Sequence, residues 1–288
     1  MSGLNSPGSV IAKTIKLYID GKFPRTESGR SYPVYKSGTE EVFANLCLSS
    51  RKDVRMAVES SHKALKGWGK RTAYNRGQIL YRMAEMMESK RAEFLNILTE
   101  VMGQDETTAQ KSFDNGIDVL VYYAGFADKF SQVLASVNPV SGPFHNFTTP
   151  DPVGVVGLIY DEDFALDRFL AQVASVICSG NTTVVIFDQP GATMISALGE
   201  VLATSDVPGG VVNLLSGSIE ELYKHLSGHM EVQSVSYSGE SSERYTDMKE
   251  LAIENMKRVV KWNDFETQDL QPIAAFTEYK TIWHPVGL

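Results

Sequence analysis

Apolar residues in the first half of the chain recur three or four positions apart, which is the spacing of one face of an α-helix. Val54, Val58 and Leu65 follow this pattern, and apolar residues further along repeat it twice. The spacing predicts amphipathic helices over residues 52–65, 79–98 and about 107–130.

The second half alternates short apolar runs with helical segments. The runs cover residues 153–160, 182–187, 211–215, 232–237 and 258–261. This rhythm predicts an α/β fold, a Rossmann-like doubly wound parallel sheet with helices on both faces and N-terminal helices added to it. Ser179-Gly180-Asn181 is typical of a helix C-cap, and Asp206-Val-Pro-Gly-Gly210 ends the helix before the third run.

Two segments have the pattern of β-hairpins. Residues 17–23 alternate around Asp20-Gly21, a dipeptide typical of a two-residue turn. Strands are expected over 133–137 and 144–149, because a turn-forming segment with two prolines and a glycine separates them. Residues 1–13 are rich in Ser and Gly and are expected to form a flexible leader.

Charge and composition exclude several classes of protein. The net charge of −8 argues against nucleic acid as a partner, because phosphate binding depends on clusters of Lys and Arg. The apolar runs are far shorter than the ~20 residues of a membrane helix, and no signal peptide is recognisable. Two cysteines, Cys47 and Cys178, do not form a disulfide framework and suit a reducing cytoplasm.

Three segments resemble the aldehyde dehydrogenase superfamily. Residues 151–217, beginning DPVGVVGLIY, are similar to its cofactor domain; YYAGFADK at 122–129 is similar to its pre-hairpin helix, and EYKTIWHP at 278–285 to its C-terminal strand. The resemblance implies that the catalytic domain is absent between Trp262 and Gln271, as in the truncated second domain of the two-domain branch. It implies a cofactor-type domain over 14–130 and 151–262, and a small β oligomerisation arm over 131–150 and 270–288.

The side chains that carry catalysis in the resembled family are replaced here. The family's nucleophile is a cysteine downstream of the cofactor domain, yet no cysteine follows Cys178, which is interpreted as a packing residue. The family's general base is a glutamate whose place in the run 256–262 is taken by Trp262. The asparagine that stabilises the oxyanion corresponds to Asp163, whose carboxylate would repel a developing negative charge.

Cofactor contacts implied by the resemblance are also missing. Phe187 and Pro190 take the places of the lysine and glutamate that hold the adenosine ribose. At the pyrophosphate turn, Gly239 is kept but Glu240 follows it, and an anion there would repel a dinucleotide. Arg244 could attract a phosphate or pair with Glu240 four positions away. No cofactor is therefore expected; NAD or NADP would bind only if the cleft has been remodelled.

Two groups of side chains have the chemistry of metal ligands. Asp161, Glu162, Asp163 and Asp167 could form an oxygen-rich site for Mg²⁺ or Ca²⁺, although an acidic loop at a helix N-terminus is the favoured interpretation. His225 and His229 have the spacing of a zinc pair, but Gly228 interrupts their helix and no carboxylate completes the motif. No metal is expected.

The parts that remain are structural, which predicts a non-catalytic role. The resemblance implies that the arm reaches across an oligomer, and Tyr279, Thr281 and Trp283 lie on its expected edge strand. The sequence thus favours an inactive homologue that acts as an assembly or regulatory partner of an intact aldehyde dehydrogenase, or of a second copy. The alternatives are a dinucleotide-binding module with a remodelled cleft, an NAD(P)-dependent oxidoreductase, and a decayed copy without a role.

Overall fold

Five parallel strands form the central layer of the protein. The computed structural model describes residues 12–161, 164–188 and 190–287. The strands are β6 (Val155–Asp161), β7 (Thr182–Phe187), β8 (Val212–Ser216), β9 (Ser234–Gly239) and β10 (Arg258–Lys261). They lie in the order β10-β9-β6-β7-β8 and every neighbouring pair is parallel. The predicted fold class is confirmed, and two runs, 182–187 and 258–261, match the observed strands residue for residue.

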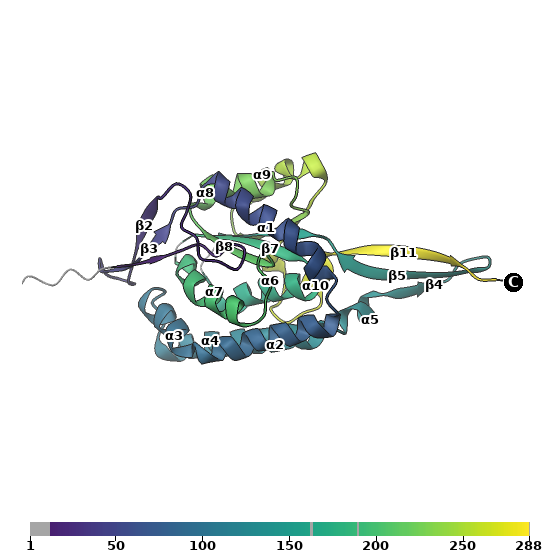
Figure 1. The fold of residues 1–288 in the computed structure, drawn as a ribbon, viewed down its shortest axis with the longest axis horizontal. Helices are drawn as coiled ribbons and strands as arrows, with labels where there is room; N and C mark the ends of the chain where they lie inside the picture. The colour runs from purple at the N-terminus through teal and green to yellow at the C-terminus, as the bar shows by residue number, and fades with distance from the viewer. Residues whose placement is uncertain (1–11, 162–163, 189, 288) are drawn as a thin grey trace, which may run out of the picture.

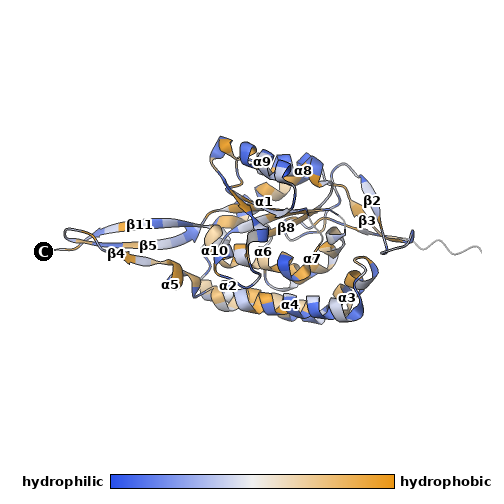
Figure 2. Cartoon of the chain, turned by 180° about the vertical axis from the view of Figure 1, so that it is seen from behind, coloured by the Kyte–Doolittle hydropathy of each residue, from blue (hydrophilic) through white to orange (hydrophobic). Residues whose placement is uncertain are grey.

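Helices cover both faces of this sheet (Figure 1). Alternate residues of a strand point to opposite faces, so Val155 and Ile159 of β6 pack with one set of helices, and Val156 and Leu158 with the other. The first set is α1 (Arg51–Gly69), α8 (Ile219–Ser227) and α9 (Ser242–Leu251). The second set is α2 (Ala73–Ser89), α4 (Glu106–Phe126), α6 (Leu166–Cys178) and α7 (Ile195–Thr204). Figure 2 shows α6 and α7 as largely apolar.

The second predicted helix is interrupted in the structure. Residues 79–98 belong to two helices, α2 and α3 (Arg91–Glu100), which meet at Lys90. Lys90 has φ −108° and ψ 13°, outside the helical region, and its N–H donates to the carbonyl groups of Met87 and Glu88. Met87 and Phe94 are nevertheless both buried. Apolar spacing reports which side chains face the core, so it did not detect a local break in the backbone.

The strand predicted over 133–137 is confirmed only at its end, and its first residues are wrong. The chain forms a short helix, α5 (Phe130–Leu134), and the strand that follows, β4, covers Ser136–Asn138. Phe130 is buried at the edge of the main body and anchors the helix. The backbone becomes extended at Ala135, and there the chain leaves the body.

A small sheet lies at the N-terminal end of the body. It contains β1 (Lys13–Ile15), β2 (Ser31–Tyr35) and β3 (Val42–Cys47), in the order β1-β3-β2. The predicted turn at Asp20-Gly21 is confirmed: Ile19 and Lys22 exchange two backbone hydrogen bonds of 3.0 Å, and both turn residues have positive φ. Tyr18 also pairs with Leu214 of β8, which joins this hairpin to the central sheet.

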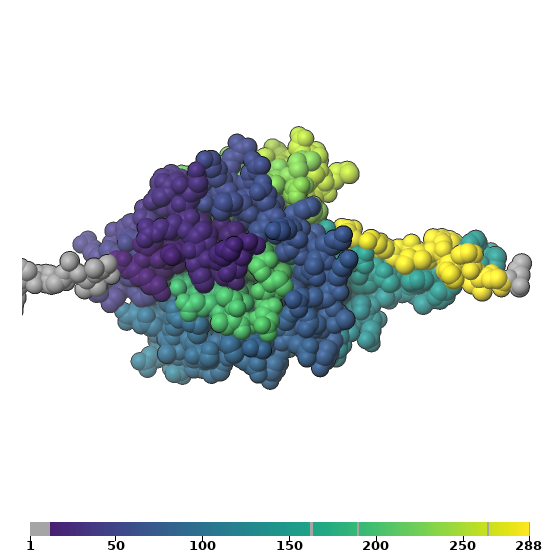
Figure 3. Space-filling model, in the orientation of Figure 1, coloured from purple at the N-terminus to yellow at the C-terminus, as the bar shows by residue number. Residues whose placement is uncertain are grey.

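A second three-stranded sheet forms an arm that projects from the body (Figures 1 and 3). Its strands are β4, β5 (Phe144–Pro152) and β11 (Thr277–Pro285), with β5 in the middle. β5 and β11 are antiparallel and pair along their whole length, from Thr277 opposite Pro152 to Pro285 opposite Phe144. Before β11, helix α10 (Gln271–Ala275) buries Pro272 and Ile273 against the body. None of the helices in the described residues is long and apolar enough to span a membrane.

Close packing between β6 and α8 depends on the absence of a side chain at Gly157. A Cβ atom there would lie 2.9 Å from Leu226, which is buried. We expect Gly157→Ala to lower the free energy of unfolding by about 1–3 kcal/mol, because overpacking forces backbone or rotamer shifts. Gly67→Ala in α1 is the matched control: nothing lies within 4 Å of its Cβ position, so it should stabilise the protein by up to about 1 kcal/mol. Urea denaturation of both variants measures the difference, and equal effects would contradict this packing account.

Candidate functional site

The carboxyl ends of the central strands bring together most of the residues singled out in the sequence. Ligands of doubly wound sheets bind in the crevice at this edge, where the strand order reverses. Asp161 at the end of β6 lies opposite Gly239 at the end of β9, and Tyr160 lies opposite Phe187 at the end of β7. The candidate site is therefore the edge formed by β9, β6 and β7.

An aromatic cluster fills the β6–β7 side of this edge. Phe187 is 1% exposed, and its ring centroid lies 5.4 Å from that of Phe169 and 6.4 Å from that of Phe164. Tyr160 contacts the same two phenylalanines. Phe187 thus belongs to the apolar core and offers no group that could hydrogen-bond a sugar hydroxyl.

The segment after β7 is also tightly packed. Pro190 precedes the short 3-10 helix Gly191–Met194 at its N-cap. A Cβ atom at Gly191 would lie 2.5 Å from the ring of Phe164. The aromatic cluster therefore occupies the space directly beside the backbone that follows β7.

A polar cluster occupies the β6–β9 side. The Tyr237 hydroxyl donates to Asp161 Oδ2 at 2.6 Å, and Arg244 forms an ion pair with the same carboxylate. Arg244 also pairs with Glu220 at 3.0 Å. Burial, followed by the hydrogen bond to Asp161, raises the pKa of Tyr237 to about 12. These four side chains link β6, β9, α8 and α9 across the end of the sheet.

The predicted pairing of Arg244 with Glu240 is wrong. Glu240 accepts a hydrogen bond from Asn263 Nδ2 at 2.7 Å, whereas Arg244 contacts Asp161 and Glu220. The i, i+4 rule applies within a helix, and Glu240 lies before the N-cap of α9. That N-cap is Ser241, whose side chain accepts from the Arg244 N–H at 3.2 Å. One of the free donors at the start of α9 is therefore already satisfied by the protein itself.

A buried tryptophan lies next to this edge. Trp262 is completely buried at the end of β10, and its ring contacts Phe265 at a centroid distance of 5.4 Å. Within the described part of the chain, its Nε1 has no hydrogen-bond acceptor. An indole N–H can only donate a proton in a hydrogen bond, so Trp262 cannot act as a general base. Asp163 lies outside the described residues.

Comparison with known proteins identifies the family. Residues 23–261 match the aldehyde dehydrogenase family. The chain belongs to this family. It is 29% identical over 250 residues to cytosolic aldehyde dehydrogenase 1 of Elephantulus edwardii, covering 85% of this chain and 49% of that protein. It is 30% identical over 253 residues to retinal dehydrogenase 2 of Gallus gallus, covering 86% of this chain and 48% of that protein.

Solved structures of the family share the fold. The aldehyde dehydrogenase of Bacillus cereus in its NAD⁺ complex superposes with a TM-score of 0.81 and 25% sequence identity, covering 86% of this chain and 50% of that one. The chain thus spans about half the length of the aldehyde dehydrogenases that it matches.

Cys178 is a packing residue in this aldehyde dehydrogenase homologue. It is the last residue of α6 and is fully buried, and its thiol donates to the carbonyl of Ser175 at 3.3 Å. Burial raises the pKa of the thiol to about 12. Because the thiolate is the nucleophilic form, we expect Cys178 to be unreactive at neutral pH.

The candidate metal ligands are dispersed or already paired. Asp161 is paired with Arg244, whereas Glu162 and Asp163 lie outside the described residues. Helix α8 ends before Gly228, and burial lowers the pKa values of His225 and His229. Among the described residues, no group of three His, Cys, Asp or Glu side chains is arranged to hold a metal ion.

Several residues at this edge were not found from the sequence. Gln172 of α6 is fully buried and donates to Ser238 of β9, while its Oε1 has no partner among the described residues. Ser236 Oγ is similarly buried without a partner there. Two features of the sequence could have indicated these residues: Gln172 is a polar residue in an otherwise apolar helix, and serines occupy alternate positions of β9. These side chains form a polar patch inside the core beneath the candidate site.

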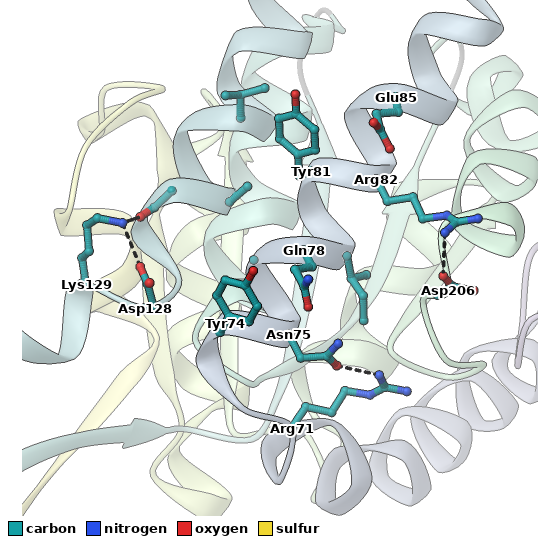
Figure 4. A pocket seen from close by; sticks show the side chains of 15 residues that line it. Arg71, Tyr74, Asn75, Gln78, Tyr81, Arg82, Glu85, Asp128, Lys129 and Asp206 are labelled. Carbon is teal, nitrogen blue, oxygen red and sulfur yellow. Dashed lines mark hydrogen bonds and ion pairs between the residues drawn. The ribbon is translucent and has the colours of Figure 1, made fainter.

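A hollow of about 940 Å³ lies away from this edge, between α2 and α4 (Figure 4). Two ion pairs lie in its wall: Arg82 with Asp206 at 3.2 Å, and Lys129 with Asp128 at 2.8 Å. Arg71 donates to Asn75 at 2.8 Å. The carboxylate of Glu85 belongs to neither ion pair, and none of the described lining residues is a cysteine that could serve as a nucleophile.

Thiol labelling tests the assignment of the cysteines to packing. Both are buried and neither forms a disulfide. In the folded protein at about pH 8, we expect neither thiol to react with Ellman's reagent within minutes, because both are enclosed and Cys178 stays protonated. After unfolding in guanidinium chloride, both should react. Rapid labelling of a Cys47→Ser variant in the folded state would show that Cys178 is accessible and ionised, contrary to this account.

Proposed function

We propose that this aldehyde dehydrogenase homologue is non-catalytic and acts as an assembly or regulatory partner of an intact aldehyde dehydrogenase. One observation carries the proposal: the chain has the projecting arm, while its own side chains fill the carboxyl ends of the strands, where a cofactor would bind. Arg244, Asp161 and Tyr237 link the strand ends where a dinucleotide would approach. A ligand would have to displace this cluster and overcome the repulsion of Glu240.

The reacting groups needed for aldehyde oxidation support the same conclusion. Oxidation through a thioester needs a thiolate and a base that activates water. No cysteine follows Cys178 in this sequence, and Cys178 itself is buried with a raised pKa. Trp262 stands where the resemblance places the base. The proposed role therefore requires neither a nucleophile nor a general base from this chain.

The arm supports a role in assembly. β11 pairs with β5 on one side, and among the described residues no strand pairs with its other side. Such an edge is a template for pairing with another chain. Tyr279 is 50% exposed and Trp283 58% exposed, although large aromatic side chains usually lose most of their exposure on folding. Thr281 lies between them and its hydroxyl is 2.9 Å from that of Thr148, which fixes the two strands in register.

The partner is inferred from length and chemistry. The chain spans about half the length of its relatives, so an intact family member would supply a sheet edge that this chain does not have. A second copy of the chain would use the same strand. We place the intact enzyme first because it would supply the catalytic half as well as a docking edge.

Native mass spectrometry of this chain mixed with an intact aldehyde dehydrogenase from the same cell tests the proposal. We expect mixed oligomers that contain both chains. The double variant Tyr279→Ser with Trp283→Ser should weaken them by about tenfold or more, because buried aromatic side chains dominate interface energies. The control is Tyr74→Ser with Tyr81→Ser on α2, which removes two aromatic side chains of similar exposure away from the arm.

Three outcomes would contradict the proposal. They are the absence of mixed oligomers, equal weakening by the control variant, and turnover of an aldehyde with NAD by the purified chain alone. The last result would support the alternative in which the chain is itself an oxidoreductase.

A further inference from the structure

Helices α1 and α8 lie side by side (Figure 1). Basic side chains from both helices line one hollow. Arg51 and Arg55 are four residues apart on α1, so they share one face of that helix. His225 is on α8, and His229 follows four residues later, just past the end of that helix. Arg51 and Arg55 line the same hollow as His225 and His229, so the two rows face each other.

These side chains enclose a hollow of about 330 Å³ on the protein surface. Its lining is basic or neutral throughout, and none of its described lining residues is a carboxylate. The lining consists of Arg51, Val54, Arg55, Lys224, His225, Gly228, His229 and Met230. The hollow thus gathers three cationic side chains and two histidines in a protein of net charge −8.

The charges in this hollow are incompletely neutralised. Arg55 pairs with Glu59 at 2.7 Å, and Lys224 lies 4.0 Å from Asp247. Arg51 has no carboxylate partner among the described residues, and both of these neighbouring acids lie outside the lining. The N-terminal turn of α1, which contains Arg51, is already capped by the buried carboxylate of Asp53, so the attraction for an anion comes from the side chains of the hollow. An anion placed here would therefore gain attraction without displacing an ion pair of Arg51.

The two imidazoles respond to the same environment. Burial is the largest cause of the lowered pKa of His225 and of His229; Arg51 lowers the first further. For His229, Arg55 and Lys257 act in the same direction, and Glu231 and Glu59 oppose them. A bound anion would offset the cationic neighbours and raise both pKa values. Proton uptake therefore accompanies anion binding, and the affinity should rise as the pH falls.

We propose that the hollow between α1 and α8 binds the phosphate group of a phosphorylated small molecule. Guanidinium groups present several N–H donors in a plane and match the oxygen atoms of a phosphate. Two arginines, a lysine and two imidazoles supply several donors, although His229 can donate only through Nε2 because its Nδ1 accepts the backbone N–H of Glu231 at 3.2 Å. The volume suits a small ligand, at the lower end of the range for such sites. The site is separate from the strand ends discussed above, since neither Arg244 nor Asp161 lines it.

Histidine NMR of the full chain tests this site, with inorganic phosphate and pyrophosphate as probes at constant ionic strength. The chain has five histidines. We expect the signals of His225 and His229 to shift saturably and their pKa values to rise. Those of His145 and His284, on the arm, should not change. The absence of saturable shifts, or equal shifts at all five histidines, would overturn the proposal.

A matched pair of variants separates the site from general charge attraction. Arg51→Gln with Lys224→Gln removes two positive charges from the hollow and should weaken phosphate binding by about tenfold or more, because charged hydrogen bonds are lost. Lys63→Gln with Lys66→Gln removes the same charge from exposed positions further along α1 and should leave the affinity unchanged. Equal weakening of phosphate binding by both variants would overturn the proposal. Unchanged NMR signals of the arm histidines serve as the control that each variant is folded.

Discussion

The ion pair between Arg244 and Asp161 is the interaction on which the functional account depends. Asp161 ends β6, and Arg244 lies in the first turn of α9, which follows β9. The pair thus connects the two strands between which an open parallel sheet would admit a ligand. Both side chains are about one-fifth exposed, and Tyr237 and Glu220 complete their hydrogen bonds. A partly buried pair with additional partners resists removal far more than an exposed one.

The aromatic cluster around Phe187 fills the neighbouring, β6–β7 side of the same edge through apolar packing. Its three phenylalanines gain stability from apolar burial and from ring contacts and have no polar group to offer a ligand, and the hydroxyl of Tyr160 donates to the carbonyl of Ala165 at 3.3 Å. One half of the edge is therefore largely apolar and packed, and in the other half the guanidinium of Arg244 is already bound by two carboxylates. The rest of the sheet keeps the two-faced burial expected of a stable α/β domain, while the arm extends away from it. The proposed role uses these two features, the stable α/β body and the exposed arm.

The sequence predicted the central sheet well because parallel strands are buried on both faces and read as continuous apolar runs. Run 182–187 is fully buried and matches β7, whereas run 258–261 matches β10, an edge strand that is only half-buried. Helix boundaries were harder to predict from the sequence, because the apolar spacing continues across the break at Lys90. The segment 133–137 was assigned to a strand because its helix, α5, has five residues and is too short to show a period. The sequence could not predict contacts between residues far apart in the chain. Arg244 was predicted to pair with Glu240, its neighbour in sequence, but it pairs with Asp161, which lies 83 positions away.

Calorimetric titration of the purified chain with NAD and with NADP tests the central claim most directly. The occupied strand ends and the anion at Glu240 predict no binding tighter than about 1 mM. An intact aldehyde dehydrogenase titrated under the same conditions provides the positive control. Micromolar binding of either dinucleotide would contradict the account, because it would require the Arg244–Asp161 cluster to open and would make the protein a dinucleotide-binding module.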